Sequence, residues 1–174
     1  MRREWRREVA ELDLAGRREE ALALIRKEAS EGNLAARVLL ARMERWVEMT
    51  AEEANRIVDD VALTMDPNDI QAHLELSSAY KVGLGNLPYE KQDQSSFYHL
   101  LKAVELGADP VFAVNLARIY AMGTLTVKPN QEEAVRWYKH AIQQGSIEAA
   151  HELQKYYRHL ERSEKRSGKD GKQN

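Results

Sequence analysis

Five histidines are the first side chains to consider, because imidazole serves both as a metal ligand and as an acid–base group. They are His73, His99, His140, His151 and His159. A metal site on a helix favours two histidines three or four residues apart, and no two of these have that spacing. His151–Glu152 begins like a zinc-protease motif, but Lys155 occupies the position of the second histidine. The histidines therefore favour surface or inter-helix roles over a metal or catalytic site.

Two other patterns are weak signals for chemistry. Gly83-Leu84-Gly85 lacks the further glycine and the Lys-Ser/Thr ending of a phosphate loop, so a turn between helices is the favoured interpretation. Paired carboxylates could do acid–base work, but they fall at helix starts or on predicted solvent faces. These pairs are Glu52–Glu53, Asp59–Asp60 and Glu132–Glu133. There is no cysteine, which excludes thiolate chemistry. The sequence predicts no catalytic residue, no metal and no cofactor, and hence no enzyme.

The composition fits a protein with a packed core and charged outer faces. Of 174 residues, 43% are hydrophobic and 31% are charged, and the net charge is −2. That charge gives no general attraction to nucleic acid. No apolar run approaches the roughly 18 residues that span a bilayer, so membrane insertion is not expected. The start lacks the apolar stretch of a signal peptide. These features predict a cytoplasmic protein, and we expect a monomer or a weak homo-oligomer.

A pattern that returns along the chain identifies the elements. Leu39, Leu76, Leu116 and Leu153 recur at steps of 37, 40 and 37 residues, each four residues before Met43, Tyr80, Tyr120 or Tyr157. A fixed period in this range is typical of helical repeat arrays, whose units cannot bury their apolar faces alone.

Two tryptophans, Trp5 and Trp46, lie outside this pattern. Each is either packed in the core or exposed as a hot spot for binding, and packing is the favoured interpretation.

Helical periodicity and capping signals predict nine helices. Their expected ranges are 3–14, 17–31, 34–47, 51–65, 68–82, 93–107, 110–122, 131–144 and 147–163. Thr50 with Glu53, and Asn130 with Glu133, have the spacing of capping boxes, and Asp109 precedes a proline at a first helical position. The helices pair into hairpins near 3–32, 33–66, 67–108 and 109–145, and the helix at 147–163 closes the end as a cap.

Residues 109–145 resemble a Sel1-like repeat, a relative of the tetratricopeptide repeat. The first helix supplies the expected alanine, leucine, tyrosine and glycine, and the second supplies an alanine, a tryptophan–tyrosine pair, an alanine and a closing glycine. These residues are Ala113, Leu116, Tyr120 and Gly123, then Ala134, Trp137, Tyr138, Ala141 and Gly145. The unit at 70–108 keeps Leu76, Tyr80, Gly83, Gly85, Ala103 and Gly107, but has Ser96, His99 and Leu100 in its second helix. The unit at 33–66 keeps only the apolar pattern.

The resemblance implies a fold and a class of function. It covers roughly residues 33–160 and implies an all-α, right-handed superhelical solenoid of antiparallel helix hairpins. With the first hairpin included, we expect one repeat domain over 1–163. The resemblance also implies an adaptor that binds a protein or peptide partner on the concave face. A more specific alternative is a bacterial immunity protein that neutralises a cognate secreted toxic effector. An enzyme or a nucleic-acid-binding protein is the less favoured alternative.

The repeat register predicts which residues meet the partner. In tetratricopeptide-type arrays the first helix of each hairpin lines the concave side. Once the buried leucines and tyrosines are fixed, certain first-helix positions remain free to point inward. They are Arg37, Glu44, Gln71, Glu75, Ser78, Lys81, Asn115, Arg118 and Met122. This mixed polar set suits a protein or peptide partner.

The C-terminal segment is basic. Over 155–174, seven lysines and arginines face three carboxylates, which leaves +4 there and −6 on the rest of the chain. Such a segment could touch an acidic partner, a membrane or RNA, although a solubilising extension is the favoured interpretation. Its Ser, Gly and Lys content predicts a disordered tail over 164–174.

Overall fold

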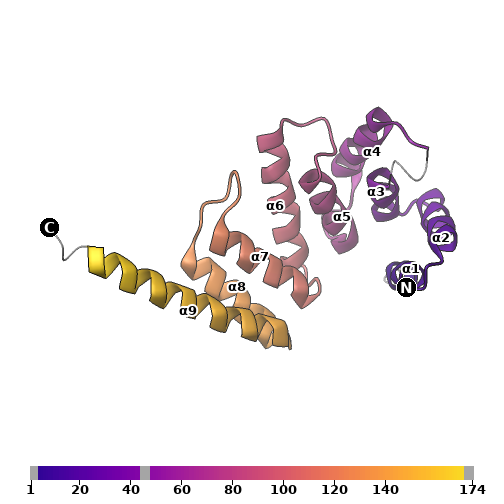
Figure 1. The fold of residues 1–174 in the computed structure, drawn as a ribbon. Helices are drawn as coiled ribbons and strands as arrows, with labels where there is room; N and C mark the ends of the chain where they lie inside the picture. Colours follow the sequence, from indigo (N-terminus) through magenta and orange to yellow (C-terminus); the bar gives the residue numbers. More distant parts are fainter. Residues whose placement is uncertain (1–3, 44–47, 171–174) are drawn as a thin grey trace. The chain divides into compact units, whose positions relative to one another are not determined.

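The protein is built from α-helices. The computed structural model describes residues 4–43 and 48–170, with residue 4 and residues 164–170 described by their backbone alone. The described part contains nine helices and no strand (Figure 1). They are α1 (Glu4–Leu14), α2 (Arg18–Ser30), α3 (Leu34–Arg42), α4 (Ala51–Thr64), α5 (Ile70–Lys81), α6 (Tyr89–Glu105), α7 (Pro110–Met122), α8 (Gln131–Gln143) and α9 (Ile147–Asp170). The predicted all-α helical-repeat class is confirmed.

The chain divides into two compact units. Unit 1 spans residues 1–107 and contains the pairs α1–α2, α3–α4 and α5–α6. Helix α3 packs against both α2 and α5, so consecutive hairpins of this unit stack on one another. Unit 2 spans residues 108–174, in which α8 packs against α7 on one side and α9 on the other. The predicted right-handed superhelix and the division into one repeat domain and a tail stay predictions.

Side-chain caps begin most helices where the sequence indicates. Thr50 and Glu53 form a complete capping box at α4, because the hydroxyl accepts from the Glu53 amide and the Glu53 carboxylate accepts from the Thr50 amide. The Asn130 side chain accepts from the Glu133 amide at α8, and Asp109 caps α7 ahead of Pro110. These bonds satisfy amide groups that would otherwise lack a partner.

Three helix boundaries differ from the prediction by four residues or more. Helix α3 ends at Arg42 with Met43 as its C-cap, rather than continuing to 47, and residues 44–47 lie outside the described part. Helix α6 begins at Tyr89, four residues before the predicted 93, because Pro88 occupies the N-cap and the buried Gln92 already lies in the first turn. The backbone of α9 continues to Asp170 rather than ending at 163.

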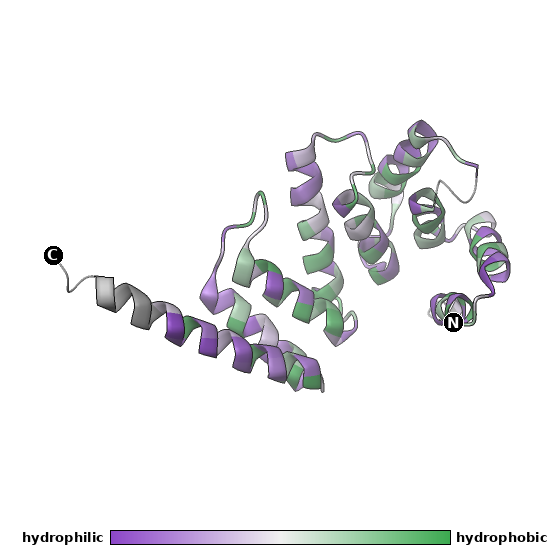
Figure 2. Ribbon diagram, in the orientation of Figure 1, coloured by the Kyte–Doolittle hydropathy of each residue, from purple (hydrophilic) through white to green (hydrophobic). Residues whose placement is uncertain are grey.

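The repeating leucines form the core as predicted. Leu76 and Leu116 are fully buried, and Leu39 and Leu153 are nearly so. Trp5 is also buried and packs in the cluster of α1, α2 and α3, while Trp46 lies outside the described residues. The repeat position of Tyr157 also predicts a core role, and this prediction is wrong, because the residue is 40% exposed. Figure 2 shows hydrophilic and hydrophobic residues alternating along the helices. None of the described helices is long and apolar enough to cross a bilayer.

The turn at 83–86 ties the second and third hairpins of unit 1 together. The Asn55 side chain accepts a bond of 2.9 Å from the Gly85 amide, and the Asp59 carboxylate accepts from the amide and side chain of Asn86. Gly85 has a φ of +94°, and an added Cβ would lie 2.9 Å from the Tyr80 ring. Backbone amides that could hold a phosphate are thus already bonded to α4, which supports the turn interpretation over a phosphate loop.

Candidate partner-binding surfaces

A buried carboxylate joins three helices of unit 1. Glu75 on α5 is 1% exposed and accepts from Arg6 on α1 and from Arg42 on α3. The Arg42 Nη1 to Glu75 Oε2 distance is 2.7 Å. The prediction that Glu75 is free to meet a partner is therefore wrong. Its carboxylate is paired with two arginines inside the unit. Burying this carboxylate without them would be costly.

Beside this clamp lies a hollow of about 310 Å³ that hairpin α1–α2 and helix α3 enclose. Its floor is apolar and includes Val9, Ile25 and Leu39, while Arg6 and Asp13 stand on its rim. The complete lining is Arg6, Val9, Ala10, Asp13, Arg18, Ala21, Ile25, Leu39 and Met43. Arg6 thus serves both the clamp and the rim. An apolar floor with a few charged groups at its edge is the usual composition of a site that receives an apolar side chain.

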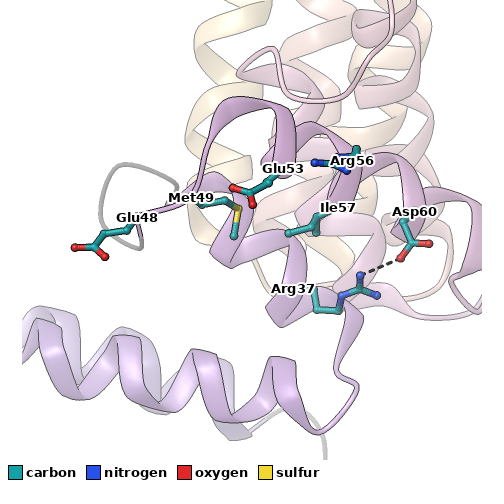
Figure 3. Close-up of a pocket in the computed structure, with 7 residues that line it drawn as sticks. All are labelled: Arg37, Glu48, Met49, Glu53, Arg56, Ile57 and Asp60. Atoms are coloured by element: carbon teal, nitrogen blue, oxygen red, sulfur yellow. Dashed lines mark ion pairs between the residues drawn. The ribbon is translucent and has the colours of Figure 1, made fainter.

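Arg37 lines a larger and more open hollow of about 570 Å³, at the α3–α4 hairpin (Figure 3). Its guanidinium forms an ion pair with Asp60 on α4 at 3.0 Å, and both side chains remain partly exposed. Met49 and Ile57 contribute the apolar part of the lining. Arg37 is therefore accessible but already paired. Glu44, the other predicted contact on this hairpin, lies outside the described residues.

The remaining unit 1 predictions lie on α5. Gln71 and Ser78 are half-buried and share the helix face of Glu75, because the three positions are separated by four and three residues. Lys81, one turn further on, is exposed. Among the predicted unit 1 contacts that the structure describes, Lys81 is the one that is exposed and has no ion pair.

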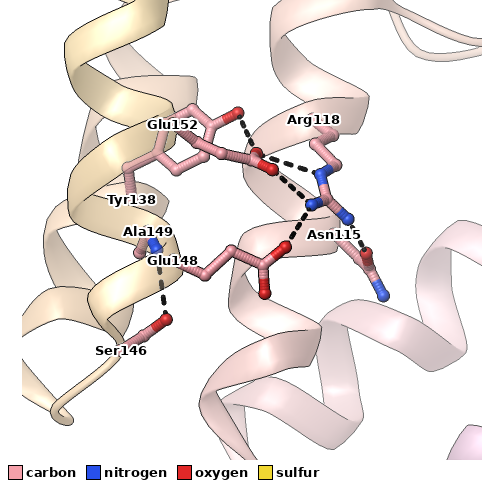
Figure 4. A network of polar contacts seen from close by, with 7 residues as sticks. All are labelled: Asn115, Arg118, Tyr138, Ser146, Glu148, Ala149 and Glu152. Atoms are coloured by element: carbon pink, nitrogen blue, oxygen red, sulfur yellow. Dashed lines mark hydrogen bonds and ion pairs between the residues drawn. The ribbon is translucent and has the colours of Figure 1, made fainter.

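In unit 2, Arg118 on α7 is held by side chains of α9 (Figure 4). Its guanidinium donates to Glu148 at 2.7 Å and to Glu152 at 3.0 Å, and a third bond goes to Asn115 at 3.0 Å on α7 itself. The Tyr138 hydroxyl on α8 donates to the same Glu152 carboxylate at 3.1 Å. The prediction that Arg118 and Asn115 are free is therefore wrong, because α9 places Glu148 and Glu152 one turn apart opposite Arg118. Met122 is 74% exposed, as the prediction requires.

This network shifts the pKa values of its side chains. The hydrogen bond from Arg118 lowers the pKa of Glu152, and the same bond raises the pKa of Arg118. Burial, with the bond to Glu152 second, raises the pKa of Tyr138 to about 12. Arg118 is thus a structural cation that fastens α9 to α7, and a partner would have to break this network to use it.

We expect Arg118→Ala to destabilise unit 2 by roughly 1–2 kcal/mol at pH 7, the range for a partly exposed multi-bond charge pair. The lowered pKa of Glu152 sets the sign of the pH dependence. The stabilisation is present above the ordinary glutamate pKa of 4.5 and is lost as the pH falls further, through the lowered value. Urea unfolding at pH 7 and at pH 3 measures both effects. Lys81→Ala is the matched control and should stay within about 0.5 kcal/mol. Equal stability of the two variants at pH 7 would contradict the structural role of Arg118.

Two histidines that the sequence analysis did not pair are in contact inside unit 1. The Nδ1 atom of His73 on α5 lies 2.8 Å from the Nδ1 atom of His99 on α6, and both side chains are buried. His73 Nε2 lies 3.0 Å from the Pro67 carbonyl oxygen, which can only accept, so Nε2 carries the proton of a neutral His73. His99 Nδ1–H then donates to His73. The repeat alignment could have revealed the pair, since His99 takes the place of Trp137 and His73 that of Ala113.

Burial, and secondarily the neighbouring His73, lowers the pKa of His99 to about 4. A lowered folded-state pKa gives stability that is present above the unfolded value of 6.5 and is lost as the pH falls toward 4. That shift corresponds to roughly 3 kcal/mol. We expect His99→Gln, which keeps a donor for His73 but does not titrate, to lose less stability than the wild type between pH 7 and pH 4. Urea unfolding curves at several pH values test this, and parallel pH profiles for the two proteins would contradict it.

At least one member of each carboxylate pair has a structural partner. Glu53 completes the α4 capping box, Asp59 holds the 83–86 turn, and Asp60 pairs with Arg37. Glu133 pairs with Arg136 at 3.0 Å. Within the described residues, no group of three or more His, Asp or Glu side chains could hold a metal ion.

Comparisons with known proteins agree with the hairpin geometry. Residues 70–107 and 110–146, which contain α5–α6 and α7–α8, match the family model described as Sel1 repeat. Among solved structures, the chain is similar to a Sel1 repeat protein from Oxalobacter formigenes, with 25% identity and a TM-score of 0.50 over 75% of this chain and 95% of that one. It also has a weaker likeness to a protective antigen of uropathogenic Escherichia coli strains that displays an SLR fold. There the identity is 20% and the TM-score 0.36, over 80% of this chain and 37% of that one. No curated protein matches the chain.

Proposed function

We propose that the chain, in which residues 70–107 and 110–146 match the Sel1 repeat, is an adaptor that binds a protein or peptide partner, as helical repeat arrays commonly do. The partner-binding site proposed here is the hollow that α1, α2 and α3 enclose in unit 1. The exposed Lys81 in unit 1 and Met122 in unit 2 remain proposed contacts from the repeat register.

The hollow of about 310 Å³ is the observation that carries this proposal. Its apolar floor suits one large apolar side chain of the partner, and the charged groups on its rim suit polar atoms of the partner backbone or flanking residues. The Arg6–Glu75–Arg42 clamp fixes one wall, because it ties α1 to α3 and α5. A wall that is already rigid lowers the entropy cost of ordering the site on binding.

A variant that fills the hollow tests the proposal. Ala10 lies on its lining and is exposed, so Ala10→Trp should occupy the space without disturbing the core. Proteins that co-purify with the tagged wild type from the native host should be lost or reduced at least tenfold with this variant. The matched control is Ala150→Trp, at an exposed helical position of α9, which should retain them. Equal recovery with both variants would place binding elsewhere.

The immunity-protein alternative stays a proposal that the same experiment can separate. An immunity protein would retain one dominant toxic partner, and its expression would rescue cells that produce that partner. An adaptor would retain a protein that is harmless when expressed alone. Growth of cells that express the recovered partner, with and without this protein, distinguishes the two.

A further inference from the structure

Helix α9 carries a row of basic side chains outside the surfaces described above. Lys155, Arg158, His159 and Arg162 are separated by three, one and three residues, and together they line a shallow hollow of about 150 Å³. All four are exposed. Positions with this spacing share one face of a helix. The row is therefore a continuous basic surface, which we call the α9 basic row.

The α9 basic row faces away from the packed side of its helix. Ala149 and Leu153 are buried, and Tyr156 and Leu160, which continue that spacing, are half-buried. At 100° per residue the basic positions centre on the side opposite these apolar ones. The row is thus directed outward from unit 2.

Carboxylates of the described residues form no ion pair with the row. The two acidic side chains in the first half of α9, Glu148 and Glu152, bond to Arg118. No ion pair within the described residues engages Lys155, Arg158 or Arg162, although the charge of Lys155 is among the causes that lower the pKa of Glu152. Arg158 donates to the Gln154 carbonyl at 3.4 Å. Unpaired charges at helical spacing create a local positive potential that attracts an anionic partner.

The sequence extends the same spacing beyond the described side chains. Lys165, Arg166 and Lys169 follow Arg162 at intervals of three, one and three residues, and the backbone is helical to Asp170. From residue 155 to residue 169 a helix rises roughly 21 Å at 1.5 Å per residue. The extended row has six lysines and arginines and one histidine in this register, with Glu161 and Glu164 between them in the sequence.

We infer that the α9 basic row is a docking site for an acidic helix of a partner protein. Charge complementarity selects an anionic partner, and the helical spacing matches carboxylates that repeat every three and four residues. Single-stranded nucleic acid prefers aromatic platforms between the cations, and the row contains none. A membrane-surface helix requires an exposed apolar face beside the basic one, whereas the apolar side of α9 is packed on unit 2. This site is separate from the unit 1 hollow, so either can fail without the other.

A helical peptide probe tests the inference on the full chain. The probe is an alanine-based peptide with glutamates at the spacing of the row, and a second peptide of equal composition has its glutamates distributed around the helix. Fluorescence anisotropy at low salt should show the first peptide binding at least tenfold more tightly than the second. The double variant Arg158→Glu with Arg162→Glu should weaken that binding at least tenfold, and 0.5 M NaCl should also weaken it.

The matched control is Lys128→Glu with Lys139→Glu, which changes the net charge equally at exposed unit 2 positions that do not belong to α9. It should alter the affinity less than twofold. Circular dichroism checks the fold. If the double variant Arg158→Glu with Arg162→Glu unfolds, Arg158→Gln with Arg162→Gln replaces it.

Equal weakening of binding by the α9 double variant and by the control would overturn the inference in favour of general charge attraction. Tighter binding of phosphatidylserine vesicles or oligouridine than of the peptide would overturn the acidic-helix partner. Wild-type self-association that is lost in the α9 variant would assign the row to a second copy.

Discussion

Replacing Trp137 with alanine is expected to lower the free energy of unfolding by roughly 3–5 kcal/mol, the range for removing a buried tryptophan. Trp137 lies on α8 and is 6% exposed. The Arg136 guanidinium lies 4.7 Å from its ring centroid, and His140 meets the ring edge-on. Truncation would leave a cavity in a small unit that consists of three helices within the described chain. Urea unfolding followed by circular dichroism measures the loss.

A conservative replacement at the same position separates packing from hydrogen bonding. The indole Nε1 is buried and has no hydrogen-bond partner. Trp137→Phe therefore removes volume without leaving an acceptor unsatisfied, and we expect it to retain most of the stability lost in the alanine variant. A melting temperature unchanged by Trp137→Ala would show that the ring is exposed in solution, and Trp137 would then become a candidate contact for a partner.

The buried apolar positions could be predicted from the sequence because their spacing is local. Leu76 and Leu116 follow the repeat period and are fully buried, and Trp137 is buried where the repeat places it. The caps at Thr50 and Asn130 were equally predictable, because donor and acceptor lie three residues apart. Local rules therefore identified the helices and most of the residues that pack them.

Whether the polar first-helix residues are paired or available to a partner could not be predicted in the same way. Glu75 and Arg118 occupy positions that the repeat leaves unassigned, yet their partners are 69 and 34 residues away. Whether such a side chain is free depends on which charges the neighbouring helices bring to it. A packing motif carries no information on those charges. The predicted binding set was therefore weakest at the residues with the strongest ionic partners.

Glu75→Ala is the second variant with a large expected effect, a destabilisation of roughly 3 kcal/mol. Removing one member of a buried ionic group leaves the opposite charges uncompensated, which costs more than the intact group contributes. Glu75 is 1% exposed, whereas Arg6 and Arg42 keep about a third of their side chains in solvent, at 35% and 27%. Partial hydration of the two arginines places the expected loss at the lower end of the range for broken buried pairs. The effect should appear in unit 1 by urea unfolding.

A triple variant tests whether uncompensated charge is the cause. Arg6→Met, Arg42→Met and Glu75→Leu together remove both cations with the anion and leave side chains of similar size. If stranded charge causes the loss, the triple variant should be more stable than Glu75→Ala, because apolar replacements of a buried ionic triad are often neutral or stabilising. A triple variant as unstable as the single one would instead mean that the shape and hydrogen bonds of the clamp hold α1, α3 and α5 together. In either case partner binding by the Ala10→Trp variant should be measured in parallel with these variants, because Arg6 belongs to both the clamp and the rim of the proposed site.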